Sequence, residues 1–171
     1  MKINQVDEKV IADIGRAFAF YDYGAERGLV SAFAKNEQTA IYIEGFVRVM
    51  LKAGFLYTTS ERQEGFIAYK RPGEKVCLSA TLPLLKGVMQ SMTFGEAVRF
   101  ARCMGKGGTG LKKRLEKEKK PFVYVGMVCV REAYQGQGYM RKVMEMAFEE
   151  GKRLHVPVVL ETDAKSKCDK Y

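Results

Sequence analysis

Two closely spaced glycines mark a turn whose residue types suit the binding of a phosphate group. The six residues of this turn are Gln135, Gly136, Gln137, Gly138, Tyr139 and Met140. Glycine has no Cβ to block an approaching anion, and the backbone N–H groups of such a turn, with the positive end of a following helix, attract negative charge. A dinucleotide-binding fingerprint would require a third glycine where Arg141 stands. The turn therefore predicts a phosphate site of a different type, unless it is an ordinary strand-to-helix crossover.

The elements on either side of the turn must hold it in place. Residues 122–130 form an apolar run rich in Val, which is typical of a strand buried on both faces. After the turn, apolar residues recur every three or four positions, which predicts a helix with one inward face. That face comprises Val143, Met144, Ala147, Phe148 and Leu154. A second buried strand is expected at 158–162, and a crossover of this length predicts parallel strands with a right-handed connection.

The remaining elements are predicted from periodicity and from cap residues. A capping box of Thr93 and Glu96 predicts the start of one helix, and Gly54 predicts the end of another. Residues 105–110 are rich in glycine and predict a flexible break. The expected elements are a short first strand at 2–6, helices at 7–20 and 36–52, a hairpin of strands at 54–59 and 65–70, helical segments within 76–104 starting near Pro83, and a short charged helix within 111–120.

The order of strand, Arg-Glu-Ala-Tyr, Gln-x-x-Gly-x and helix resembles the acetyl-CoA signature of the GNAT family of N-acetyltransferases. The family writes the signature Gln/Arg-x-x-Gly-x-Gly/Ala, and Met140 departs from it at the sixth position. The resemblance covers residues 54–171 and is sharpest over 122–171. It implies an α/β (α+β) fold, with a mixed, mostly antiparallel twisted sheet, a central splayed parallel strand pair and flanking helices. It also implies a single domain over 1–171, with a helical insertion at about 76–120.

The resemblance also implies roles for individual residues. The turn at 135–140 would bind the diphosphate of acetyl-CoA, and the backbone of Val128, Cys129 and Val130 would bind its pantetheine arm. Tyr171 matches a family tyrosine that can protonate the departing thiolate, a role that a phenol with a pKa near 10 suits, although a frayed terminal residue is an equal alternative. Lys167 stands where the family usually has a cofactor-contacting Asn. Glu161 is the candidate base for the incoming amine, although a structural carboxylate is an equal alternative.

The expected activity is direct transfer of an acetyl group from acetyl-CoA to a primary amine, carried by a small molecule or a peptide. Two alternatives remain open. The chain could be a CoA-binding or regulatory module without catalysis, or a basic nucleic-acid-binding protein that uses residues 111–120. The net charge of +9 suits nucleic acid and CoA alike, but the glutamates within 111–120 argue against nucleic acid.

The composition sets further bounds on the protein. A chain of 171 residues without a long apolar run fits one domain with no membrane segment. Four scattered cysteines and one histidine, His155, predict reduced thiols, a cytoplasmic protein and no metal site. The family continues beyond the matching tyrosine into a final strand, and this sequence stops there. Because an uncovered sheet edge promotes association, a homodimer is expected.

Overall fold

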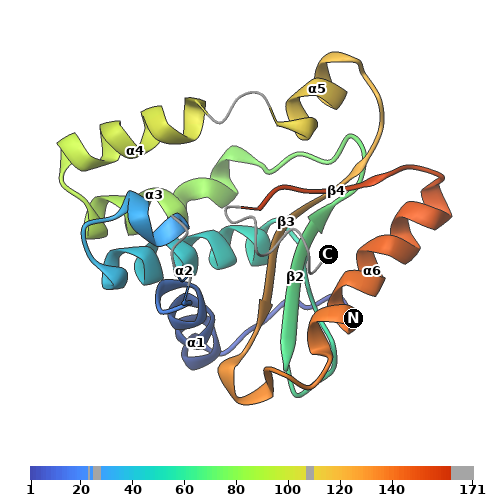
Figure 1. Ribbon diagram of the computed structural model, residues 1–171, viewed down its shortest axis with the longest axis horizontal. Helices are drawn as coiled ribbons and strands as arrows, with labels where there is room; N and C mark the ends of the chain where they lie inside the picture. The colour runs from blue at the N-terminus through green and yellow to red at the C-terminus, as the bar shows by residue number, and fades with distance from the viewer. Residues whose placement is uncertain (23, 25–27, 107–109, 163–171) are drawn as a thin grey trace.

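A mixed four-stranded sheet lies at the centre of the molecule (Figure 1). The computed structural model describes residues 1–22, 24, 28–106 and 110–162, of which 103–106 are described by their backbone alone. The strand order is β1-β2-β3-β4, with β1 at Leu56–Thr58, β2 at Gly65–Lys70, β3 at Val123–Val130 and β4 at Val158–Leu160. The pairs β1/β2 and β2/β3 are antiparallel, whereas β3 and β4 are parallel. The parallel pair is the strand–helix–strand unit that the sequence predicts.

Helices cover both faces of the sheet (Figure 1). The helices α1 (Glu8–Ala19) and α2 (Asn36–Lys52) pack on one face, and α6 (Tyr139–Leu154) packs on the other. The helices α3 (Leu82–Ser91), α4 (Phe94–Lys106) and α5 (Leu111–Lys117) extend along one side of the molecule. Three short 3₁₀ turns lie at Leu29–Ala32, Leu78–Thr81 and Glu132–Tyr134.

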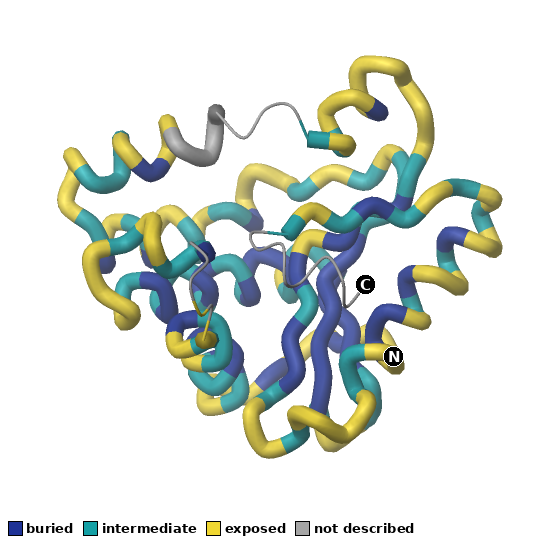
Figure 2. Tube along the Cα trace, viewed as in Figure 1, coloured by how far each residue is buried: buried dark blue, intermediate teal, exposed yellow. Residues whose placement is uncertain are grey.

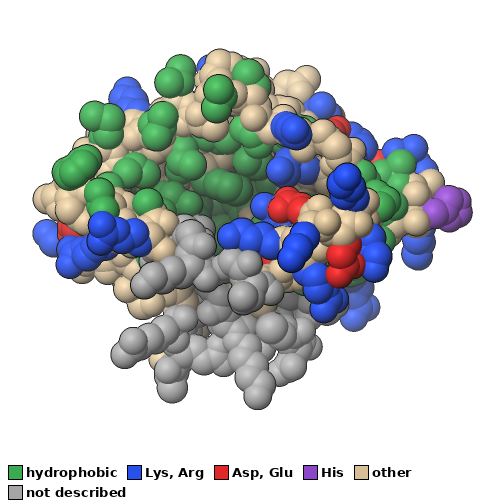
Figure 3. All heavy atoms as spheres, turned by 90° about the horizontal axis from the view of Figure 1, so that it is seen from above, with side chains coloured by type: hydrophobic (Ala, Val, Ile, Leu, Met, Phe, Trp, Pro, Cys, Tyr) green, Lys and Arg blue, Asp and Glu red, His purple; other side chains and the backbone are tan. Residues whose placement is uncertain are grey.

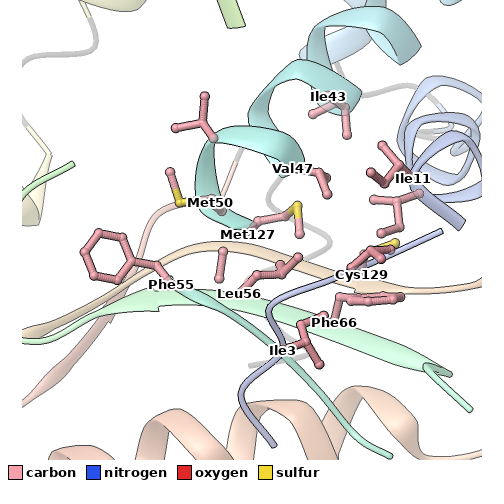
Figure 4. Close-up of a cluster of buried hydrophobic side chains, with 14 residues drawn as sticks. Ile3, Ile11, Ile43, Val47, Met50, Phe55, Leu56, Phe66, Met127 and Cys129 are labelled. Atoms are coloured by element: carbon pink, nitrogen blue, oxygen red, sulfur yellow. The ribbon is translucent and has the colours of Figure 1, made fainter. Parts of the chain in front are cut away.

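Alternation along the strands divides the core into two clusters. Phe66 and Cys129 point toward α1 and α2, where they meet Ile11 and Val47 (Figure 4). The opposite face of the same strands packs against α6. Each fully buried side chain of this size contributes about 1.5–3 kcal/mol. The strands are therefore the most buried elements, and the segments around α4 and α5 are largely exposed (Figure 2).

Local sequence signals place several element ends correctly. Gly54 follows α2 with φ +74°, and the Phe55 N–H donates to Met50 O at 2.9 Å, so the helix closes at a left-handed glycine. At the start of α4, the Thr93 N–H donates to the Glu96 carboxylate at 2.8 Å, and the Glu96 N–H donates back to the Thr93 hydroxyl at 3.4 Å. The predicted capping box is confirmed.

Four predictions about individual segments are wrong. The expected strand at 2–6 is reduced to one bridge between Lys2 and Tyr57. Phe148 is 39% exposed, because the buried face of α6 runs through Val143, Met144, Ala147 and Gly151, and Phe148 lies at the margin of that face. The helix α4 continues through Lys106, into the first two residues of the break expected at 105–110, and residues 107–109 lie outside the described residues. The strand β4 ends at Leu160, and only its middle residue, Val159, is buried.

Candidate functional site

The turn between β3 and α6 has the backbone geometry of an anion site. Gly136 and Gly138 have φ of +74° and +80°, values that favour glycine. A Cβ at either position would meet no atom within 4 Å, so glycine is favoured there by the backbone conformation and not by a lack of room for a side chain. No described side chain caps α6, whose first residue, Tyr139, follows Gly138 directly. The first N–H groups of α6 are thus available to an external acceptor.

Two glutamine side chains of this turn donate hydrogen bonds to backbone carbonyl groups just before it. Gln135 donates from Nε2 to Val130 O at 3.2 Å, which ties the turn to the end of β3. Gln137 donates from Nε2 to Ala133 O at 3.1 Å and is exposed. Both side chains face the protein backbone, so these two predicted ligands hold the turn in shape and leave anion contact to the backbone.

Arg131 anchors the same turn to α1 and to β2. Its Nη2 forms an ion pair with Asp13 Oδ2 at 3.0 Å, and its N–H donates to Glu64 O at 3.0 Å. Its guanidinium lies 5.6 Å from the centroid of the Tyr134 ring. Hydrogen bonds from Thr59 and then Ser60 lower the pKa of the Glu64 carboxyl, so a fixed negative charge stands on the β2 side of the turn.

A cavity of about 390 Å³ opens between the turn, β3 and the end of α1. Eight of the predicted site residues line this cavity, and Gln137 does not. Ala17, Phe18, Tyr21 and Tyr134 complete the wall, and sequence reasoning missed all four. The eight predicted residues in the lining are Val128, Cys129, Val130, Gln135, Gly136, Gly138, Tyr139 and Met140.

Cys129 lines this cavity without being a nucleophile. Its side chain is 4% exposed and belongs to the core on the α1 and α2 side. Burial raises the pKa of its thiol to about 12, so the thiol stays protonated at neutral pH. Any role of Cys129 in binding is therefore a role of its backbone.

The sheet opens at Gly126. Ala68 pairs with Met127 and Tyr69 pairs with Val125, so Gly126 is the extra residue of a β-bulge. On the other side of β3, the last pair with β4 joins Val125 to Leu160. Among the described strands, the edge of β3 that faces β4 is unpaired beyond that point. Within the described residues, this edge of β3 therefore runs without a strand partner from the bulge to the cavity beside the turn, where Val130 O accepts from Gln135.

Glu161 lies at the opening rather than at the cavity. It directly follows Leu160, so the register places it level with Gly126. Its Oε1 accepts a hydrogen bond from the Lys112 N–H at 3.4 Å, and its carboxylate also bonds the Tyr124 phenol. Burial, followed by the nearby charge of Glu161, raises the pKa of Tyr124. Neither Tyr124 nor Gly126 carries a signal in the sequence that would identify it as part of a site.

Two predicted site residues, Lys167 and Tyr171, lie outside the described residues. Within the described part, no group of three or more His, Cys, Asp or Glu side chains could hold a metal ion. No described helix combines the length and the apolar character that crossing a membrane requires.

Comparison with known proteins finds a family model that matches this part of the chain. Residues 92–167 match the acetyltransferase (GNAT) family. The matched range begins at the end of α3 and includes β3, the turn, α6 and β4. No curated protein matches the chain. The match therefore covers the turn, the bulge and Glu161 together.

Proposed function

We propose that this protein transfers the acetyl group of acetyl-CoA to a primary amine, because residues 92–167 match the acetyltransferase (GNAT) family. The observation that carries the proposal is one continuous path. It starts at the uncapped end of α6, passes the apolar cavity and follows the free edge of β3 to the bulge at Gly126. A long ligand with a diphosphate at one end and a reactive group at the other suits such a path.

The two ends of the proposed path differ in chemistry, as the two ends of acetyl-CoA do. At the turn, the N–H groups of residues 136–140 would bind the diphosphate. Along β3, the N–H and C=O groups within residues 126–130 that point away from β2 would pair with the amide groups of the pantetheine arm, as an added strand pairs with a sheet edge. Val130 O is an exception, because it accepts from Gln135. The apolar side chains of the cavity, such as Phe18 and Val128, would cover the arm.

The chemistry would take place at the opening of the sheet. The amine nitrogen forms a bond to the thioester carbon while the carbon–sulfur bond breaks, and the CoA thiolate leaves. A backbone N–H within 126–130 would stabilise the negative charge that develops on the carbonyl oxygen. Glu161 would accept the proton that the amine loses, and Tyr171 would give a proton to the thiolate. Most of the rate enhancement would come from holding the amine and the thioester in a reactive orientation.

The turn variant Gly138→Ala tests the diphosphate site. Alanine at φ +80° is strained, so the chain must shift the N–H groups that would bind the anion. We expect acetyl-CoA to bind about tenfold more weakly, as measured by isothermal titration calorimetry. Gly73→Ala is the matched control, because Gly73 has φ +81° and equally open space in a different turn. Equal losses of affinity in both variants would contradict the proposal.

A thiol-release assay over a panel of amines tests the transfer itself. A CoA-binding module without catalysis is the second candidate, because the Met140 side chain lines the cavity where the family has a small residue. Tight binding of acetyl-CoA without release of CoA thiol for any amine would favour that candidate. Release that depends on the amine, and that falls in Glu161→Gln with an altered pH profile, would support acetyl transfer with Glu161 as the base.

A further inference from the structure

A second cavity lies at the other end of β3 from the turn. Its volume is about 420 Å³, and its walls come from the segment after β2, from α5 and from the start of β3. Six basic and two acidic side chains line it. Lys and Arg side chains also predominate on the surface around α5 when the molecule is seen from above (Figure 3). The cavity is therefore a concentrated positive site, distinct from the diphosphate turn.

Two lysines of this cavity share one aromatic ring. The Nζ of Lys112 lies 4.7 Å from the centroid of the Tyr124 ring, and the Nζ of Lys70 lies 5.9 Å from it. Lys70 forms no ion pair with any described carboxylate, and the ammonium group of Lys112 forms one such pair, to Glu116 at 3.8 Å. Burial and the neighbouring Lys112 lower the pKa of Lys70. The two ammonium groups repel each other, Glu116 and Glu74 offset part of that repulsion, and a bound anion would reduce it further.

Other cations of the cavity already have partners. Arg71 is paired with Glu74 and Glu150, and Lys120 is paired with Glu118. An anion in the cavity would therefore be bound by Lys70 and Lys112 against the Tyr124 ring, and the exposed Lys75 and Lys119, which likewise form no ion pair with the described residues, would add positive charge.

Tyr124 connects this pair of lysines to the opening of the sheet. The ammonium groups of Lys70 and Lys112 lie against its ring, and its phenol bonds the Glu161 carboxylate. The Lys112 backbone N–H bonds the same carboxylate. An anion at the lysines and an amine at Glu161 would thus be separated by about one tyrosine side chain. A single small molecule can carry both groups at that separation.

We propose that this cavity binds the anionic group of the amine acceptor, so that the substrate class is a primary amine that also carries a carboxylate or a phosphate. This inference rests on the proposed acetyl transfer for the role of the amine. The anion stays bound to Lys70 and Lys112 throughout. At the other end, the amine nitrogen forms the amide bond, the carbon–sulfur bond breaks, and the amine proton passes to Glu161.

Matched pairs of amines test the substrate class. An ω-amino acid is compared with its amide, and an aminoalkyl phosphate with the amino alcohol, at several chain lengths. We expect kcat/KM to be at least about tenfold higher for the anionic member of one pair, mainly through KM, and to fall with added salt. Preference for the carboxylate or for the phosphate identifies the anion. Equal kcat/KM within every pair would overturn the inference.

Variants of the two lysines test the site directly. In Lys70→Gln and Lys112→Gln, KM for the anionic amine should rise about tenfold, while the Kd for acetyl-CoA changes by less than about twofold. Lys9→Gln, at an exposed position at the start of α1, is the control for the loss of one positive charge. Thermal unfolding of each variant checks that the fold is retained. A KM that rises equally for the neutral amine, or does not rise, would overturn the inference.

Binding of the anionic amine without acetyl-CoA separates this inference from the proposed function. Calorimetric titration of the unmodified protein should show binding that Lys70→Gln weakens and Lys9→Gln does not. If this dependence holds but acetyl-CoA fails to bind, the anion site stands and acetyl transfer is refuted. If acetyl-CoA binds and the anionic amine shows no dependence on Lys70, acetyl transfer stands and the anion site is refuted.

Discussion

Glu150 should stabilise the fold through two arginines, and the size of its contribution can be worked out from the structure. Its Oε1 lies 2.5 Å from Arg71 Nε and 2.5 Å from Arg153 Nη2, and its side chain is only 12% exposed. Hydrogen bonds from Arg153 and then Arg71 lower the pKa of Glu150 from 4.5 to about 2. A depression of this size corresponds to roughly 3 kcal/mol, and exposure of Arg153 reduces it to about 2 kcal/mol.

The sign of the pH dependence follows from the lowered pKa. The folded protein holds Glu150 ionised more strongly than the unfolded chain does. Its contribution is therefore complete above pH 4.5, the ordinary value, and is lost as the pH falls through about 2. Glu150→Gln should lower the free energy of unfolding by about 2 kcal/mol at pH 7, and the deficit should shrink as the pH falls below 4.5.

Urea unfolding at a series of pH values between 7 and 2.5 measures this effect. Glu149→Gln is the control, because Glu149 is the exposed neighbour of Glu150 on α6 and forms no ion pair with the described residues. It should change the free energy of unfolding by less than about 0.5 kcal/mol. A deficit in Glu150→Gln that is the same at pH 7 and pH 2.5, or equal to that of Glu149→Gln, would refute the reasoning. The ion pair between Glu150 and Arg71 also bears on the second cavity, because Arg71 belongs to the segment after β2 that forms one wall of that cavity.

Two further variants or measurements follow from the first site. Asp13→Asn should lower the free energy of unfolding by about 1–2 kcal/mol and weaken acetyl-CoA binding, because Arg131 loses a partly buried partner that links the turn to α1. Glu8→Gln is the control, because it removes the more exposed ion pair with Arg48. Equal effects of the two variants would contradict this role of Asp13. Cys129 should resist a thiol reagent in the native protein at pH 8, because a pKa of about 12 leaves roughly one thiol in ten thousand ionised. Peptide mapping by mass spectrometry should show exposed Cys77 labelled first, and labelling of Cys129 at the same rate would show that the core opens readily.

Local sequence determined several elements of the fold and the turn of the first site. The helix at 36–52 has the predicted bounds, the Thr93 capping box forms, and the turn after β3 has its two left-handed glycines. These features depend on periodicity, caps and backbone preference over a few neighbouring residues, so they can be predicted one segment at a time.

Tertiary structure decided which residues meet. The bulge at Gly126 comes from the register between β2 and β3, and no residue pattern within β3 predicts it. Tyr21 reaches the first cavity only because α1 packs across β3, and Lys70 meets Lys112 only because α5 is folded back over the end of β2. Contacts between segments far apart in the chain depend on how the packed layers are arranged, and single-sequence periodicity does not report that arrangement. The sequence alone thus determined the turn between β3 and α6, and only the tertiary structure assembled the basic cavity at the other end of β3.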